Sequence, residues 1–277
     1  MTSPPRGPGP PDRAVLTAGG HECPAGDGGT PRPGRALAAA LQDRPRAVVV
    51  PMTLGRDPGL TAAAAQTMAW AARDREPGAL LLARPLGTVT HLVGWLRAAV
   101  VRALRGGDGG RAALLVAPAG RPEDDAELFK VARLVWRHLR APWVEVAFGD
   151  GEPGVPDGAD RCRRLGAREV VLVPASLVPP PVWPGALTAG PLLGPAALAA
   201  LVRARAAEAE LRWGRDGDDG LAAAGHRHGH GHEHGHGHRH GHEHGHGHGH
   251  GHPHEPAHDH FAGITETSLR EAAVHGR

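Results

Sequence analysis

Histidines are the residues whose type and spacing most clearly indicate chemistry, and they crowd the stretch 226–260. An imidazole stands there at nearly every second position, mostly with glycine between. Neutral imidazole is the commonest protein ligand of late divalent transition metals, and glycine lets neighbouring rings converge on one ion. We predict that the following residues bind metal: His226, His228, His230, His232, His234, His236, His238, His240, His242, His244, His246, His248, His250, His252, His254, His258 and His260.

The same stretch is too poor in apolar residues to form a core. Nothing in it would offset the entropy of ordering its backbone, so we predict a disordered segment over 213–277. An expression tag is the simpler alternative. The interleaved Glu233, Glu243 and Arg239 argue against a tag and favour a natural metal-binding segment.

A second set of candidates lies where apolar runs end in the first part of the chain. His21 follows the run 14–18, Arg56 and Asp57 follow the run 47–50, and His91 begins a helical pattern after the run 79–83. Ligands of open α/β sheets bind beyond the carboxyl ends of the strands. We predict His21 as metal ligand and proton acceptor, and Arg56, Asp57 and His91 as substrate-binding residues. An exposed loop histidine at 21 and an ordinary first-turn polar residue at 91 are the alternatives.

Composition excludes several classes of function. The chain has no GxxxxGK[ST] loop and no G-x-S-x-G elbow, which argues against ATP-driven phosphoryl transfer and against that type of hydrolase. Its formal net charge is +2, with acids and bases spread along it, so no basic face for nucleic acid is expected.

Cysteine usage and hydropathy bear on the location of the protein. Cys23 and Cys162 form no CxxC pair, so we expect no disulfide framework and a reducing, cytoplasmic setting. No apolar run reaches 18 residues, and no signal peptide precedes the first strand. We therefore expect no membrane partner.

The elements that must position these residues alternate regularly. Short, mostly apolar runs predict strands over 14–18, 47–50, 79–83, 112–117, 143–148, 170–173 and 187–189. Helical periodicity predicts helices over 35–42, 60–73, 88–105, 123–140, 157–165 and 195–212. Apolar strands that alternate with amphipathic helices are typical of α/β proteins whose small parallel sheets are covered by helices on both faces.

The pattern also repeats. Residues 48–54 (VVVPMTL) align with 171–177 (VLVPASL), and Arg13-Ala-Val-Leu aligns with Arg111-Ala-Ala-Leu. We predict two tandem α/β halves over 13–105 and 111–212, preceded by a disordered leader over 1–12.

Three segments of the second half resemble sirohydrochlorin cobaltochelatases, the class II metal chelatases of cobalamin and related tetrapyrrole synthesis. They are 120–136 (GRPEDDAELFKVARLVW), 144–148 (VEVAF) and 161–174 (RCRRLGAREVVLVP). The resemblance extends over about 13–212. It implies ATP-independent insertion of a divalent metal, Co²⁺ or possibly Ni²⁺, into a tetrapyrrole, with the metal as substrate and no permanently bound cofactor.

The resemblance also bears on single residues. The family places a histidine after the first strand in a G-H-G-S turn, and Gly20-His21-Glu22 stands at that place here. A second family histidine follows the P-x-x-L strand end, where this chain reads Leu54-Gly-Arg-Asp-Pro58. Two other hypotheses stay open: a non-enzymatic metal storage or delivery protein on the same scaffold, and an α/β enzyme unrelated to tetrapyrroles.

Overall fold

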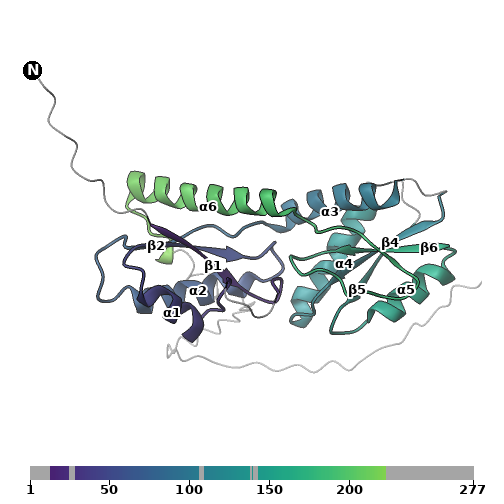
Figure 1. Ribbon diagram of the computed structural model, residues 1–277, viewed down its shortest axis with the longest axis horizontal. Helices are drawn as coiled ribbons and strands as arrows, with labels where there is room; N and C mark the ends of the chain where they lie inside the picture. The colour runs from purple at the N-terminus through teal and green to yellow at the C-terminus, as the bar shows by residue number, and fades with distance from the viewer. Residues whose placement is uncertain (1–12, 25–28, 106–108, 138, 140–142, 223–277) are drawn as a thin grey trace, which may run out of the picture. The chain divides into compact units, whose positions relative to one another are not determined.

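The computed structural model describes residues 13–24, 29–105, 109–137, 139 and 143–222 (Figure 1). Within these ranges the chain forms two small parallel sheets, each covered by helices, which confirms the predicted α/β fold class. The histidine-rich stretch lies outside the described residues. No helix in the described part is long and apolar enough to cross a membrane.

The first sheet has the order β1-β2-β3, formed by β1 (Ala14–Gly19), β2 (Ala47–Met52) and β3 (Leu80–Leu82). Every residue of β2 is buried, as expected of a central strand covered on both faces. Side chains of β2 alternate between the two faces. Val49 packs with Leu37 of α1 (Arg35–Gln42) and Met68 of α2 (Pro58–Ala71), whereas Val48 and Val50 belong to the core on the other face.

The second sheet has the order β5-β4-β6-β7. Its strands are β4 (Arg111–Ala117), β5 (Val144–Phe148), β6 (Glu169–Pro174) and β7 (Leu187–Thr188). Leu114 of β4 packs with Cys162 of α5 (Val155–Arg164) on one face. Leu115 packs with Leu128 and Val131 of α4 (Pro122–Arg137) on the other face.

Each sheet also takes one covering helix from the other half of the sequence. Helix α3 (Val89–Leu104) follows β3 along the chain but packs against α4, β4 and β6 of the second sheet. Helix α6 (Pro195–Asp216) follows the second sheet but packs against β1, β2 and β3 (Figure 1). The ranges 13–105 and 111–212 thus describe the sequence repeat, and as domain boundaries they stay a prediction.

The end of the folded part lies later than residue 212. Helix α6 continues to Asp216 and ends at Gly217, which adopts a left-handed conformation with φ of 65°. Beyond it, the carbonyl of Asp219 accepts a hydrogen bond from the backbone N–H of Leu82 at 2.8 Å. Because these contacts attach residues up to 222 to β3, the predicted start of the tail at 213 is too early.

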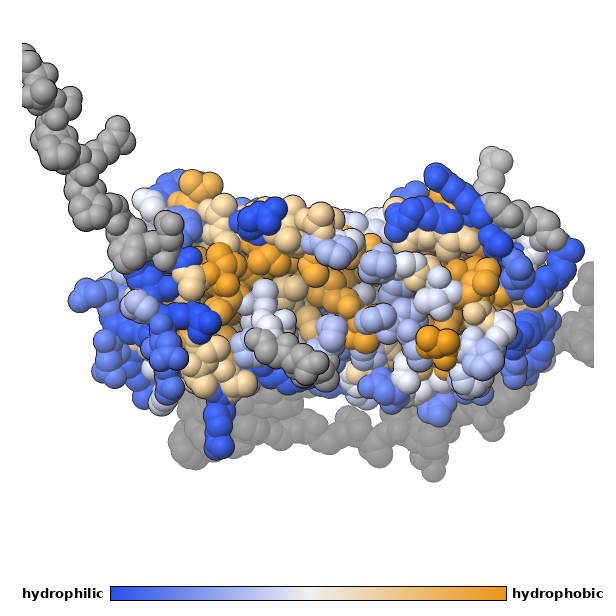
Figure 2. Space-filling model, in the orientation of Figure 1, coloured by the Kyte–Doolittle hydropathy of each residue, from blue (hydrophilic) through white to orange (hydrophobic). Residues whose placement is uncertain are grey.

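The described part of the chain contains two free cysteines and shows a surface of mixed hydropathy. Cys23 and Cys162 are buried free thiols, and burial raises the pKa of each to about 11. Hydrophilic and hydrophobic residues are mixed on the face shown in Figure 2. The most exposed long apolar side chain of α6 is Leu211, at 74%.

Candidate functional site

The loops after β1 and β2 contact the loop after β4, so the two carboxyl edges meet. Arg56 donates from Nε to the carbonyl of Asp124 at 3.3 Å and from Nη2 to Oδ1 of Asp125 at 3.2 Å. The backbone N–H of Leu177, after β6, donates to the carbonyl of Glu22 at 3.0 Å. Arg56 and the residue that follows His21 therefore contact the second half.

His21 lies at this junction, with its two ring nitrogens in different surroundings. Nδ1 is 3.3 Å from Oδ2 of Asp57, and the two side chains are 18% and 16% exposed. Nε2 is buried and has no hydrogen-bond partner among the described residues. It lies against Gly120, where an added Cβ would be 3.1 Å away. An ionised Asp57 holds the proton on Nδ1, so that Nε2 presents a lone pair.

Asp57 is itself fixed by the start of α2. It is the N-cap residue, and its Oδ1 accepts from the backbone N–H of Leu60 at 3.1 Å. Burial alone would raise the pKa of the Asp57 carboxyl, but the hydrogen bond and charge of His21 bring it below its usual value. Gly20 is required here, because a Cβ at that position would lie 2.0 Å from Oδ2 of Asp57.

Two buried ionisable side chains lie beside the histidine. Glu22 and Arg56 are both 0% exposed. Oε2 of Glu22 accepts hydrogen bonds from the hydroxyl of Thr53 and, at 2.9 Å, from the backbone N–H of Leu54. Oε1 of Glu22 and Nη1 of Arg56 have no partner among the described residues. Two opposite charges, each with one unused polar atom, are therefore enclosed next to His21.

Burial shifts the pKa values of both Glu22 and Arg56. It raises the pKa of the Glu22 carboxyl, although the hydrogen bond from Thr53 and the charge of Arg56 act in the opposite direction. Burial also lowers the pKa of the Arg56 guanidinium, with Glu22 as the strongest opposing charge. Glu22 was not predicted as a site residue. Its place directly after His21, in a turn rich in glycine, is the signal that could have found it.

Comparison with known proteins concerns mainly the second half of the chain. Residues 114–179 match the CbiX family. Over 54 residues the chain is 37% identical to the sirohydrochlorin cobaltochelatase of Priestia megaterium, a match that covers 19% of this chain and 18% of that protein. Both matches are to metal-chelatase sequences, and each covers less than a quarter of this chain.

The CbiX match begins within β4 and continues past β6. It includes Gly120, Asp124 and Asp125, which contact His21 and Arg56, but it does not include His21, Arg56 or Asp57 themselves. The roles of these three residues therefore stay predictions. Their support is the geometry of the junction.

His91 is not brought into contact with His21. Its Nδ1 accepts from the backbone N–H of Thr88 at 3.2 Å and lies 2.9 Å from the Thr88 hydroxyl, forming the capping box of α3. Its ring stacks on Trp95 with 5.6 Å between centroids. The structure thus gives this exposed residue a capping function, and its part in substrate binding stays a prediction.

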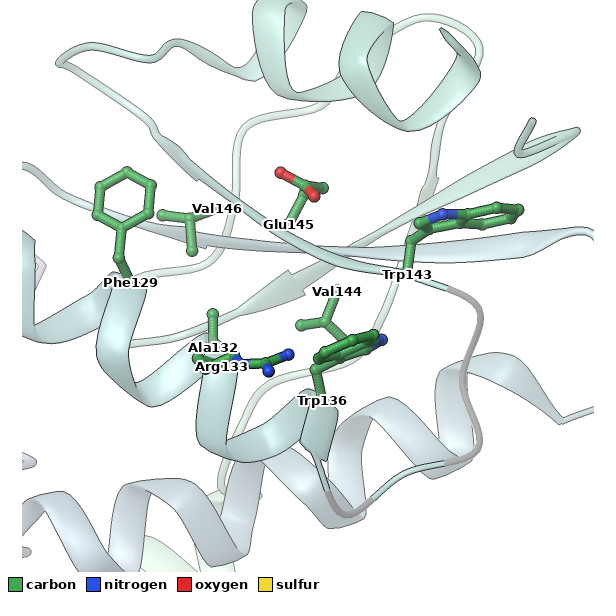
Figure 3. Close-up of a pocket in the computed structure, with 8 residues that line it drawn as sticks. All are labelled: Phe129, Ala132, Arg133, Trp136, Trp143, Val144, Glu145 and Val146. Carbon is green, nitrogen blue, oxygen red and sulfur yellow. The ribbon is translucent and has the colours of Figure 1, made fainter. Parts of the chain in front are cut away.

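Two hollows near the second sheet differ in their relation to the site. One, of about 280 Å³, is lined by apolar residues that follow β6, including Leu177, which is bonded to Glu22. The other lies between α4 and β5 and is lined by Phe129, Trp136 and Trp143, among others (Figure 3). No histidine of the described residues lines the second hollow, and we do not assign it to the site.

The described residues hold no preformed metal centre. No group of three or more His, Cys, Asp or Glu side chains in that part of the chain is arranged to hold an ion. His21 with Asp57 is a single imidazole oriented by a carboxylate, which suits transient ligation or proton transfer better than storage.

We predict that Glu22 makes the stability of the protein depend on pH. The pKa of Glu22 is higher in the folded protein than in the unfolded chain. Its contribution to the free energy of unfolding is therefore fully present below the pKa of an unfolded glutamate, about 4.3. This contribution is lost as pH rises through the folded-state pKa. Glu22→Gln should remove this loss. Urea unfolding of both proteins between pH 4 and 8 measures it, with exposed Glu123→Gln as the control. Parallel pH curves for wild type and Glu22→Gln would contradict the prediction.

Proposed function

We propose that this chain inserts a divalent metal ion, Co²⁺ or Ni²⁺, into sirohydrochlorin or a related tetrapyrrole without ATP. The observation that carries the proposal is the His21 imidazole, oriented by Asp57 with its Nε2 lone pair unused at the junction of the two halves. The CbiX match supports a metal chelatase. A cytoplasmic location, no permanently bound cofactor and no nucleic-acid or membrane partner belong to the same proposal.

Metal insertion requires a base, and the His21 imidazole at the site can act as one. When a divalent metal replaces the two inner protons of a tetrapyrrole, a base must accept each proton that leaves. Nε2 of His21 can accept one, and the Asp57 carboxylate then stabilises the imidazolium through Nδ1. The second proton would pass to solvent water or buffer. Because Nε2 is covered by Gly120, the proposal requires the turn at 118–120 to move away from the imidazole when substrate binds.

The surroundings suit a planar, partly apolar substrate with anionic groups. The apolar hollow after β6 is connected to the Glu22 loop through Leu177 and offers a surface for part of a macrocycle. Predicted residue Arg56 is buried and already bonded to Asp124 and Asp125. We therefore infer that Arg56 holds the two loops together beside the substrate rather than contacting the substrate's carboxylates.

A second candidate function is metal storage or delivery on a chelatase scaffold. It is favoured by the contrast between one oriented imidazole at the junction and the many histidines of 226–260, which lie outside the described residues. On this hypothesis the histidine-rich stretch would hold the metal, and the junction would have no insertion activity.

An insertion assay separates the two functions. Purified protein is mixed with Co²⁺ and sirohydrochlorin, and formation of the metallated product is followed by absorbance against a protein-free reaction. The chelatase proposal expects a rate that is proportional to protein concentration and clearly above the protein-free rate. A rate equal to the protein-free rate, with Co²⁺ bound to the protein, would leave storage or delivery as the function.

Deleting residues 223–277 should affect insertion only when metal is scarce. We expect the truncated protein to lose rate at limiting Co²⁺ and to match the full chain at saturating Co²⁺, because the stretch raises the local metal concentration without contacting the reacting atoms. The deletion begins after the contacts that attach residues up to 222 to β3. A full-length variant with glutamines at the histidines of 226–260 is the matched control for chain length. Equal loss at saturating Co²⁺ would contradict the prediction.

A further inference from the structure

A pocket separate from the two hollows described above lies at the amino-terminal edge of the first sheet. It is at the opposite strand ends from His21. It has a volume of about 670 Å³, which falls within the range of small-molecule sites. Arg13 and Arg46, the residues immediately before β1 and β2, line it together with Arg75 and Trp213. Nothing in the proposed insertion reaction uses this pocket.

The strand register places two of these arginines side by side. Ala14 pairs with Ala47, and the backbone N–H of Ala14 donates to the carbonyl of Arg46 at 3.1 Å. Arg13 and Arg46 are thus neighbours on adjacent parallel strands and leave the same face of the sheet. Like charges in such positions repel each other and destabilise the pairing.

The second sheet shows the opposite arrangement at the corresponding strand start. There Arg111 is in register with Glu169, and Nε of the arginine lies 2.6 Å from Oε2 of the glutamate. The two halves share the pattern Arg-Ala-x-Leu at this position, yet only the second sheet supplies an acidic neighbour from the adjacent strand. The first sheet therefore lacks the anion that the second sheet carries as a side chain.

The guanidinium groups of the pocket are held in place but incompletely neutralised. Arg13 is 6% exposed, donates to Glu210 at 2.8 Å and to the carbonyl of Gly78 at 2.5 Å, and has a buried Nε without a partner in the described chain. Arg75 donates to the carbonyls of Arg44 and Leu41, at 2.6 and 2.8 Å, and not to a carboxylate.

The remaining charges leave the pocket positive. The Arg46 side chain, which lines the pocket, has no hydrogen-bond or ion-pair partner among the described residues. Glu76 also lines the pocket, so that three arginines face Glu76 and the Glu210 partner of Arg13. Burial lowers the pKa of Arg13, Glu210 opposes this effect, and the nearby positive charge of Arg46 adds to it.

We propose that this pocket binds a small oxyanion, a molecule that bears a phosphate or carboxylate group, between Arg13 and Arg46. Guanidinium groups bind such anions through paired, charge-assisted hydrogen bonds. The unpaired Arg46 supplies the donors, and Arg13 and Arg75, which also line the pocket, add positive charge. The Trp213 ring, packed against Gly78, forms an apolar wall for the rest of the ligand.

Calorimetric titration of the full chain tests the site, with inorganic phosphate, pyrophosphate and citrate as probes. Titration at pH 8 keeps the histidines of 226–260 neutral, so they do not attract the probes. We expect saturable binding of one equivalent of at least one probe at constant ionic strength. Phosphate or pyrophosphate binding without citrate binding would assign a phosphate ligand, and the reverse a carboxylate ligand.

Variants of Arg46 separate this site from general attraction of anions. Arg46→Ala should weaken binding at least about tenfold, as expected for the loss of a charge-assisted hydrogen bond. Arg46→Glu should abolish binding and raise the Tm without probe, because it recreates the Arg111–Glu169 arrangement of the second sheet. Arg97→Ala is the control, since Arg97 is an exposed arginine of α3 that does not line the pocket.

Three results would overturn the proposal. They are no saturable binding of any probe, equal weakening by Arg97→Ala and Arg46→Ala, and a lower Tm for Arg46→Glu than for the wild type. Arg46→Gln is the second variant, because it removes the charge at similar size, and unchanged affinity in that variant would be equally decisive.

Discussion

His21→Ala is expected to reduce the rate of metal insertion by about 10²- to 10⁴-fold, the usual contribution of a positioned proton-transferring group. The variant removes the imidazole whose Nδ1 faces Asp57 and whose Nε2 is unpaired at the junction. The rate is measured at saturating Co²⁺, so that the histidines of 226–260 cannot limit it. The free energy of unfolding of the variant, measured in parallel, shows that the fold is intact.

Asp57→Asn provides the matched variant of similar size. It keeps a side-chain oxygen for the Leu60 N–H at the start of α2 but removes the charge beside His21. We expect a smaller loss of rate than for His21→Ala, because the imidazole remains but its tautomer and its protonated form are less well stabilised. Wild-type rates for both variants would show that the junction does not carry out insertion.

Arg56→Met is expected to lower the free energy of unfolding by about 3–5 kcal/mol, the typical result of removing one partner from a buried ion pair. The guanidinium is fully buried and bridges the two halves through Asp124 and Asp125. Its removal breaks the ion pair with Asp125 and takes away the positive charge that acts most strongly on the buried Glu22 carboxyl. Urea unfolding at pH 7, followed by tryptophan fluorescence, measures the loss.

A double-mutant cycle with Glu22→Gln identifies the cause of that loss. If the enclosed charges are responsible, the double variant should be less destabilised than the sum of the single variants, by at least about 1 kcal/mol. Arg97→Met, an exposed arginine substitution, should change stability by less than about 0.5 kcal/mol. Strict additivity, or a loss for Arg56→Met no larger than that of the control, would contradict the buried-pair explanation.

The sequence alone indicated most elements of the fold. Short apolar runs such as 47–50 and 112–117 indicate buried strands, because they are too short for a typical helix and are apolar at every position, as expected of strands covered on both faces. Amphipathic periodicity located the helices, with ends that differ by a few residues from those observed. The main difference is the end of α6, because Trp213 packs against Gly78 of the distant loop before β3 and keeps the helix intact beyond 212.

The partner of each helix could not be read from the sequence. Periodicity shows which side of α3 and α6 is apolar, but the apolar faces of two similar sheets are equally suitable covers. Only the tertiary structure shows that α3 covers the second sheet and α6 the first. The same applies to Arg13 and Arg46, whose repulsion depends on strand register and is invisible when each arginine is seen in its own segment.

Some features of the candidate site could likewise be predicted from the sequence, whereas others required the tertiary structure. The sequence placed His21, Arg56 and Asp57 at one sheet edge, because the carboxyl ends of parallel strands lie together. It could not show that Glu22 is buried beside Arg56, that Gly120 covers Nε2 of His21, or that His91 caps its own helix. Those facts depend on how residues from distant strands and from the two halves pack together, and packing across such separations is decided only when the chain is folded.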